Sequence, residues 1–431
     1  MDIFDTFASY KPYNIFVVRW PSMPLNNYLE KIDNLVEATF WCTDEKIFDL
    51  VKSNNKIYIT NEEVNKKVKE KYNKQPILFG VTGSFGKTSV SWYLYQLLKQ
   101  RHTVFLSSSL GIGDDILRKN TFTTPTFIDL KRELYYTNAQ YAVIESSSQG
   151  ITQGRLGDLT FMAGIFTGFQ VDHLEFHKTI ENYLEAKLSF FLNYKPKYMV
   201  AQRLVPIPEI MKRNFVLYPS EKYIINDGIS IREKCNYETN LHNIHKENLL
   251  GAIALLNECN IEFNDLNILP PKGRLSLIGK NKFGANVYVD GAHTPQQVEM
   301  ILKYTKNPFV VIGVNGKRFI TDIKVGEVVA KYGKGIITDD GPENLDNEFI
   351  NSSLIRNTVI ELSNSKDKLI NIQNRFHAIK IALEQNVENI LILGKSTEVD
   401  TNVNYKGFSI YYDEIKVVEI LLQRQLNELI P

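Results

Sequence analysis

The chain has 431 residues, of which 43% are hydrophobic and 23% are charged, and its formal net charge is +1 at pH 7. This length predicts two or three domains, and the balanced charge gives no indication of nucleic acid as a partner. The three cysteines lack the spacing of a zinc site or disulfide framework, no apolar run is long enough to span a membrane, and the N-terminus does not resemble a signal peptide, so we expect a cytoplasmic protein.

Residues 1 to about 75 are expected to form a small N-terminal domain. This region holds an apolar segment around Val17, a strand candidate at Lys56–Thr60, and a lysine-rich helix candidate that ends at Pro76. Its lysines are typical of a solvated helix face rather than of a binding patch.

The strongest motif is the glycine turn in TGSFGKTS. An apolar run at Ile77–Val81 predicts a buried strand before the turn, and apolar residues at helical spacing follow it. Gly83 and Gly86 allow backbone N–H groups to face a phosphate, Lys87 can reach the terminal phosphates, and the Thr88 hydroxyl can bind Mg²⁺. The motif lacks one glycine of the usual P-loop, and a chance glycine turn is the alternative interpretation.

Three further strands are expected at Thr103–Ser108, Tyr141–Ile144 and Phe161–Thr167, with helices between them. This alternation predicts a parallel sheet with helices on both faces, and ligands bind beyond the carboxyl ends of such strands. Glu145 and His173 both follow a strand, so we expect them near the glycine turn. Glu145 is the best carboxylate for Mg²⁺.

The segment DHLEFH carries two histidines four residues apart, His173 and His177. Such histidines are more often structural than metal ligands when considered alone. Asp172 and Glu175, in the same segment, are expected to be solvated charges.

A helix candidate at His245–Glu258 precedes a break of periodicity at Pro270, Pro271 and Gly273. Beyond it, strand candidates end at Asp290, Val314, Asp340 and Lys395. The pattern indicates a second, smaller α/β domain. We therefore expect domains at 1–75, 76–268 (ATP-binding) and 269–431.

The chain contains, in order, TGSFGKTS, FTTP, ESSSQGITQGRL, FTGFQVDHLEFH, YLEAKLSFF, PPKGRLSLI, VDGAHTP and ILILGKSTE. This order and spacing resemble the Mur ligase family, most closely the MurE type of peptidoglycan synthesis. The resemblance implies a three-domain α/β architecture in which a central P-loop ATPase domain precedes a smaller Rossmann-like domain. It also implies an ATP-dependent ligase that phosphorylates a carboxylate, so that the amino group of an amino acid attacks the acyl phosphate.

The same resemblance implies a set of residues for ATP and two Mg²⁺ ions. The nucleotide-binding positions are Gly83, Gly86, Lys87, Thr88, Ser89, Asn248, Arg274, Asp290 and His293. The metal-binding positions are Thr88, Glu145, His173 and Lys187, and the catalytic ones are Lys87, His173 and Lys187. Lys187 matches a lysine that the family carbamylates with CO₂, whereas the sequence alone favours an exposed helix lysine. His245 stands where the family has a second adenine-side asparagine.

Small-molecule substrates are the expected partners. Thr123, Thr124, Ser147 and Arg155 match positions that hold the acceptor. Where diaminopimelate-adding relatives have Asp-Asn-Pro-Arg, this chain has Asp-Gly-Pro and then Glu343, which would repel a distal carboxylate. Glu398 matches a glutamate that accepts the distal amine, so we expect a basic amino acid rather than diaminopimelate. A solvent-facing Glu343 is the alternative.

Two departures from the family leave the acceptor open. Gln149 stands in place of a histidine, and the N-terminal region is short. The acceptor is therefore UDP-MurNAc-dipeptide or, alternatively, a molecule outside peptidoglycan synthesis, as in specialised metabolism. A degenerate ligase that only binds nucleotide and an unrelated P-loop NTPase are the competing classes, and the complete set of expected metal ligands disfavours the first. The oligomeric state is not indicated.

Overall fold

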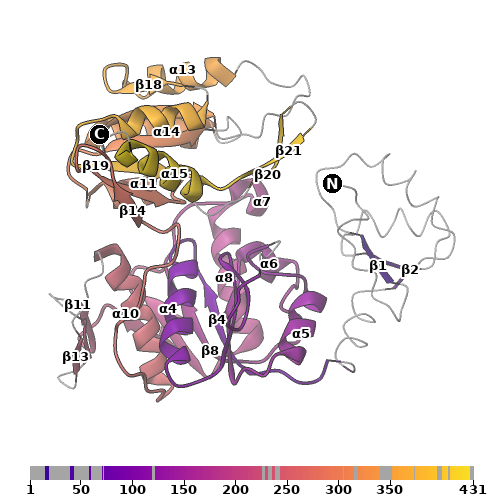
Figure 1. Cartoon of the computed structure of the whole chain (residues 1–431). Coiled ribbons are helices and arrows are strands. Elements are labelled where there is room, and N and C mark those ends of the chain that lie inside the picture. The colour runs from indigo at the N-terminus through magenta and orange to yellow at the C-terminus, as the bar shows by residue number, and fades with distance from the viewer. Residues whose placement is uncertain are drawn as a thin grey trace.

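The computed structural model describes residues 15–18, 39–42, 58–59, 70, 72–118, 122–225, 229–231, 235–237, 243–303, 305–314, 319–339, 352–372, 374–395, 400–405 and 408–427. Near the N-terminus, a parallel three-stranded sheet contains β1 (Ile15–Val18), β2 (Thr39–Cys42) and β3 (Tyr58–Ile59). Two larger α/β units lie beside it, one above the other in Figure 1. Each contains a sheet with helices on both faces, and we call them the central layer and the C-terminal layer. In the described part of the chain, no helix is long and apolar enough to cross a membrane.

The central layer is built on a seven-stranded sheet of order β10-β9-β8-β4-β7-β5-β6. Its strands are β4 (Ile77–Thr82), β5 (Val104–Ser108), β6 (Gly111–Gly113), β7 (Tyr141–Glu145), β8 (Phe161–Phe166), β9 (Tyr198–Gln202) and β10 (Val216–Tyr218). All neighbours run parallel except β5 and β6. The predicted parallel sheet is confirmed, and β4, which leads into the glycine turn, lies at its centre.

Helices cover both faces of this sheet because successive strand residues point to opposite sides. Phe79 packs into the core under α4 (Lys87–Lys99) and α10 (Asn243–Glu258), whereas Leu78 packs into the opposite core. That second face is covered by α5 (Phe127–Tyr136), α6 (Ser148–Thr152) and α8 (Ile180–Tyr194). Two short helices, α7 (Leu174–His177) and α9 (Glu209–Lys212), and an antiparallel sheet of β11 (Tyr223–Ile225), β12 (Ile229–Ile231) and β13 (Cys235–Tyr237) complete this layer.

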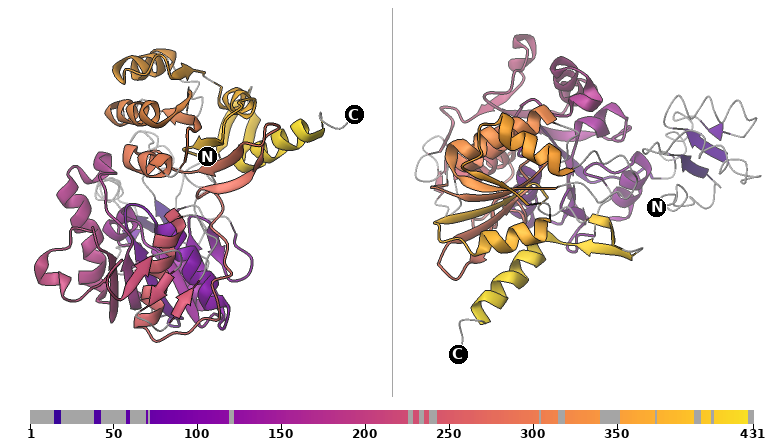
Figure 2. Two further views of the ribbon diagram at one scale, coloured as in Figure 1. Left: turned by 90° about the vertical axis from the view of Figure 1, so that its left-hand side faces the viewer. Right: turned by 90° about the horizontal axis from the view of Figure 1, so that it is seen from above.

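The C-terminal layer has a six-stranded sheet of order β14-β15-β19-β16-β17-β18, in which only β14 is antiparallel to its neighbour. Its strands are β14 (Ser276–Lys280), β15 (Asn286–Asp290), β16 (Phe309–Val314), β17 (Lys334–Asp339), β18 (Leu369–Asn371) and β19 (Asn389–Leu393). One face packs against α11 (Pro295–Lys303), α12 (Phe319–Tyr332) and α13 (Ser352–Leu362), and the other against α14 (Arg375–Leu383) and α15 (Glu414–Asn427). A hairpin of β20 (Asp400–Tyr405) and β21 (Phe408–Tyr412) extends from this layer (Figure 2).

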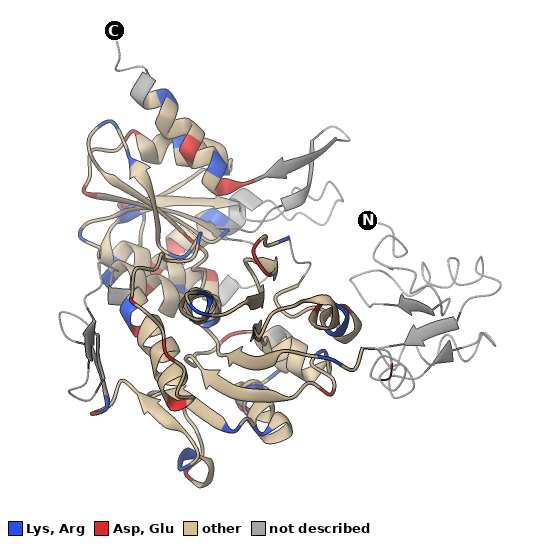
Figure 3. Cartoon of the chain, turned by 60° about the horizontal axis from the view of Figure 1, so that its bottom comes forward, with Lys and Arg blue, Asp and Glu red and all other residues tan. Residues whose placement is uncertain are grey.

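The segment that joins the two layers is attached to α4. Trp92 Nε1 and Gln96 Nε2 both donate to the carbonyl of Leu269, each at 2.9 Å. The expected domain limits at 75/76 and 268/269 stay a prediction, and most of the lysine-rich helix candidate lies outside the described residues. In Figure 3, Lys and Arg are interspersed with Asp and Glu along both layers.

Candidate active site between the two layers

The glycine turn has a backbone shape that side chains cannot easily adopt. Gly83 has φ 153° and Gly86 has φ 78°, and a Cβ added to Gly86 would lie 2.5 Å from Asn248 Oδ1. The amide of Val90 donates to Gly86 O at 2.9 Å, which begins α4 directly after the turn. The turn therefore places backbone N–H groups and a helix N-terminus at the carboxyl end of β4, an arrangement suited to phosphate.

Lys87 folds back over this turn. Its Nζ donates to the carbonyls of Gly83 at 2.9 Å and Ser84 at 3.3 Å. Burial lowers the pKa of Lys87, and the carboxylates of Glu145 and Asp172 partly oppose that shift. A bound phosphate would add negative charge beside this ammonium group and would favour its protonated form.

Glu145 lies at the end of β7, next to the turn, and is 1% exposed. Its Oε1 accepts a hydrogen bond from Thr88 Oγ1 at 3.0 Å, and its Oε2 accepts one from the Ser109 amide at 2.9 Å. Among the described residues, no three His, Cys, Asp or Glu side chains form a metal-binding group. A hydroxyl and one carboxylate nevertheless suit Mg²⁺, which is commonly held by few protein oxygens together with substrate phosphates.

Lys187 of α8 is buried, with 1% exposure, so the exposed helix lysine that the sequence alone favours is excluded. Its Nζ donates to Gly83 O at 2.6 Å and lies 4.4 Å from the centre of the Tyr183 ring. Burial, reinforced by the positive charge of Lys87, holds the pKa of Lys187 well below its usual value. This lysine therefore has an increased population of the neutral amine.

The two histidines of DHLEFH have different environments. His173 has φ 52°, and its half-exposed side chain faces the site with Nε2 at 3.7 Å from Asp172 Oδ2. His177 is buried, and its Nε2 lies 3.0 Å from Ser148 Oγ, away from the pocket. Asp172 has a side chain only 9% exposed, so the expectation that it is solvated is wrong.

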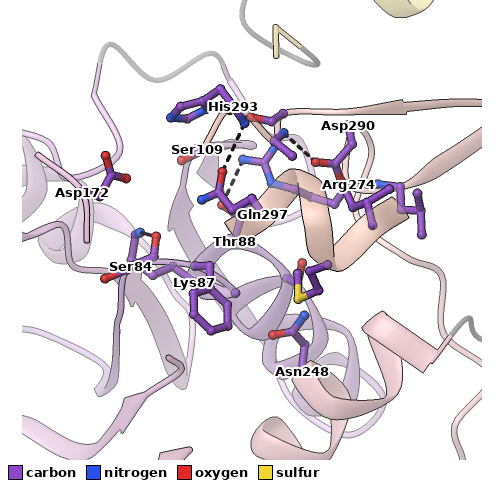
Figure 4. Close-up of a pocket in the computed structure, with 18 of the residues that line it drawn as sticks. Ser84, Lys87, Thr88, Ser109, Asp172, Asn248, Arg274, Asp290, His293 and Gln297 are labelled. Atoms are coloured by element: carbon purple, nitrogen blue, oxygen red, sulfur yellow. Dashed lines mark hydrogen bonds between the residues drawn. The ribbon is translucent and has the colours of Figure 1, made fainter. Parts of the chain in front are cut away.

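The C-terminal layer supplies the opposite wall of the pocket. Arg274 Nη2 lies 3.4 Å from Thr88 Oγ1, and Asp290 accepts hydrogen bonds from the amides of Leu275 and Ala292, each at 2.6 Å. Burial raises the pKa of Asp290, although Arg274 acts in the opposite direction. Figure 4 shows Arg274, Asp290 and His293 across the pocket from Lys87 and Thr88.

The cavity between the two layers has a volume of about 280 Å³. The predicted nucleotide and metal residues that line it are Gly86, Lys87, Thr88, Ser89, Glu145, His173, Asn248, Arg274, Asp290 and His293. Gly83 of the turn and Lys187 are not among the lining residues, and they are joined by their hydrogen bond. Thr88 and Arg274, which are 186 positions apart along the chain, thus meet at one pocket.

Comparison with known proteins relates this chain to the Mur ligases. Residues 81–255 match the model of the Mur ligase middle domain. A UDP-N-acetylmuramoyl-L-alanyl-D-glutamate–2,6-diaminopimelate ligase from Vibrio parahaemolyticus is 28% identical over 379 residues, which cover 78% of this chain and 75% of the relative. The enzyme of the same name from Rickettsia prowazekii is 29% identical over 414 residues, covering 84% and 83%.

The chain thus contains a Mur ligase middle domain and is similar to diaminopimelate-adding Mur ligases over most of its length. It is accordingly an ATP-dependent, ADP-forming ligase. A solved MurF ligase from Thermotoga maritima in complex with ADP superposes with a TM-score of 0.62 and 15% identity. The match covers 96% of this chain and 95% of the MurF chain. A pseudomurein peptide ligase type C from Methanothermus fervidus has a TM-score of 0.59 and 17% identity, covering 92% and 88%. The expected family and three-domain fold are confirmed.

The acceptor residues expected for a Mur ligase are distributed around β7. Thr123 lines the pocket. Thr124 is buried, and its Oγ1 donates to Glu145 O at 2.9 Å and accepts from the Ser147 amide at 2.8 Å. Arg155 Nη1 donates to Thr124 O at 2.9 Å. Thr124, Ser147 and Arg155 thus form a network beside the pocket, whereas Glu343 and Glu398 lie outside the described residues.

The pocket residues that the sequence analysis missed include Asp172, Ser109 and Gln297. Ser109 directly follows β5, so the rule that ligands bind at strand ends would have found it. Asp172 precedes His173 in a motif that was already selected. Gln297 lies on α11, and no local pattern marks it as facing a nucleotide.

Proposed function

We propose that this Mur ligase joins a basic amino acid to the carboxylate of UDP-MurNAc-dipeptide through an acyl phosphate. The observation that carries the proposal is the convergence at one pocket of the glycine turn, the hydrogen-bonded Thr88–Glu145 pair and Arg274 from the other layer. Backbone N–H groups and cations stabilise the charge of a transferring phosphate, and closure excludes the water that would hydrolyse an acyl phosphate.

In this proposal Thr88 and Glu145 hold one Mg²⁺, which screens the phosphate charge. His173 and a carbamylated Lys187 serve a second Mg²⁺. The buried amine of Lys187 supports this role because CO₂ reacts with the neutral amine, whose population increases when burial lowers the pKa. The carbamate would turn a cation into an anionic oxygen ligand suited to Mg²⁺.

The identity of the amino-acid substrate is proposed from the sequence. Curated relatives are named for 2,6-diaminopimelate. In this chain Glu343 stands where those enzymes are expected to carry an arginine, and Glu398 is expected to accept a distal amine. Two carboxylates would attract a cationic side chain and repel a distal carboxylate, which favours lysine or ornithine.

We further propose that residues 1–75 bind the acceptor, 76–268 bind ATP and 269–431 bind the amino acid. A cytoplasmic location follows from the use of ATP. Residues on both sides of the 268/269 limit line the pocket, so its geometry requires the two larger domains to meet around the nucleotide.

The test is ADP release from purified protein with Mg²⁺-ATP, UDP-MurNAc-L-Ala-D-Glu and lysine, ornithine or diaminopimelate, with the amide product identified by mass spectrometry. Lys87→Ala serves as the inactive control. Product with lysine or ornithine supports the proposal, whereas product with diaminopimelate alone contradicts the amino-acid assignment. ATP binding without any product favours an acceptor outside peptidoglycan synthesis, to which Gln149 already points. Absence of ATP binding contradicts the whole assignment.

A further inference from the structure

Gln170 connects the glycine turn to the C-terminal layer. It lies between β8 and α7, and its backbone carbonyl accepts a hydrogen bond from Ser84 Oγ at 3.1 Å. Its side-chain Nε2 donates to Thr294 Oγ1 at 3.0 Å. The Ser84 amide donates to Gly168 O at 2.8 Å, so the segment that carries Gln170 is attached to the turn at two points.

Thr294 is the residue immediately before α11, and it is 3% exposed. Its Oγ1 accepts from the Gln297 amide at 3.4 Å, while Gln297 Oε1 lies 3.5 Å from the Thr294 amide and 3.2 Å from the His293 amide. This reciprocal pair is a capping box, and Pro295 occupies the first helical position, where proline is favoured. The cap therefore fixes the orientation of a helix that begins beside the pocket.

The start of α11 belongs to the pocket wall. His293, Gln297, Met300 and Ile301 all line the cavity. The Gln170 side chain thus donates a hydrogen bond to Thr294, which caps the helix that contributes these side chains. The Gln170 backbone carbonyl accepts a hydrogen bond from Ser84 of the glycine turn, where the phosphates are expected to bind. A displacement of either layer would break or strain the Gln170–Thr294 hydrogen bond.

We propose that Gln170 is a positioning residue that holds the C-terminal layer closed over the nucleotide, through Thr294 and the cap of α11. This inference rests on the proposed ATP-dependent function and extends it to a residue that touches neither phosphate nor metal. Because the hydrogen bond joins the two layers, it contributes to binding only when the layers are together. Its loss should weaken the closed state and leave the glycine turn in place.

The first variant is Gln170→Met, which retains the length of the side chain but cannot donate to Thr294. Affinity for Mg²⁺-AMPPNP is measured by calorimetry on the full chain, and one lost hydrogen bond predicts a decrease of about 2- to 10-fold. Gln75→Ala is the matched control, because Gln75 also donates to a threonine, Thr160 Oγ1 at 2.9 Å, but lies away from the pocket. This control should bind the analogue like the wild type.

A double-mutant cycle separates the connection from the cap itself. Thr294→Val removes the hydrogen bond from Gln170 and also the hydrogen bond that the Thr294 hydroxyl accepts within the cap. In the Gln170→Met background the first of these is already lost, so the effect of Thr294→Val on affinity should be about 2- to 10-fold smaller there than in the wild type. Thr294→Ser keeps the hydroxyl and should restore near-wild-type affinity. Hydrogen exchange at the amides of residues 293–298 with AMPPNP bound should be faster in Gln170→Met than in the wild type.

Wild-type affinity in Gln170→Met, or additive effects in the cycle, would overturn the inference while leaving the proposed function intact. Failure of the wild-type chain to bind AMPPNP would overturn both. If Gln170→Met is unfolded by circular dichroism, Gln170→Leu provides the same comparison. An unchanged exchange rate at residues 293–298 in a folded variant contradicts the connection even if affinity falls.

Discussion

Substitution of Glu145 by glutamine separates the proposed metal-binding role of this side chain from its role in the fold. Glutamine retains the shape, and its carbonyl oxygen can accept from the Ser109 amide as Glu145 Oε2 does at 2.9 Å. Its amide nitrogen then faces Thr88 Oγ1, which lies 3.0 Å from Glu145 Oε1 and can accept as well as donate. Both hydrogen bonds are therefore replaceable, and we expect a loss of about 1 kcal/mol in the free energy of unfolding.

The effect on Mg²⁺ should be much larger, because glutamine removes the negative charge of a buried ligand. Changes around metal ligands commonly reduce affinity or activity by about 10- to 100-fold, and we expect at least the upper end of this range for Glu145→Gln. The assay is ADP release as a function of Mg²⁺ concentration, with thermal unfolding measured in parallel. Glu133→Gln is the matched control, since Glu133 pairs with Arg118 on the surface of the same layer.

Two results would refute this reasoning. Turnover within about threefold of the wild type at limiting Mg²⁺ would mean that Glu145 does not bind the metal. A variant that is destabilised by much more than about 1 kcal/mol would mean that the carboxylate charge itself stabilises the fold.

Three further predictions concern the turn and the buried lysine. Lys87→Ala should reduce ADP release by at least about 10²- to 10³-fold with unchanged thermal stability, and wild-type rates would contradict its role at the phosphates. Lys187→Ala should be inactive but partly rescued by short-chain carboxylates. Wild-type protein in ¹³CO₂ should give a carbamate signal by NMR that Lys187→Ala lacks, and the signal should increase with pH because deprotonation of Lys187 supplies the reactive amine. Gly86→Ala should lower AMPPNP affinity by about tenfold or more, since its Cβ would lie 2.5 Å from Asn248 Oδ1 at a positive φ that costs about 1–3 kcal/mol.

The alternation of strands and helices in both α/β layers could be predicted from the sequence. Apolar runs such as Ile77–Val81 and helical spacing after the glycine turn are local signals, and the structure has β4 at Ile77–Thr82 and α4 at Lys87–Lys99. The glycine turn and Glu145 at a strand end were likewise recognised, because the chemistry of phosphate and Mg²⁺ restricts which residue types follow a strand. The family resemblance added residues that no local pattern selects, such as Asn248 and Arg274.

The sequence by itself determined the periodicity of the elements and the presence of a phosphate-binding turn. Only the tertiary structure decided that Lys187 is buried against Gly83 O, that Asp172 is shielded from solvent, and that Gln170 reaches Thr294. The physical reason is that burial and hydrogen bonds between distant segments depend on how the helices and sheets pack. A helix lysine or a loop glutamine has the same local pattern whether it faces solvent or another layer.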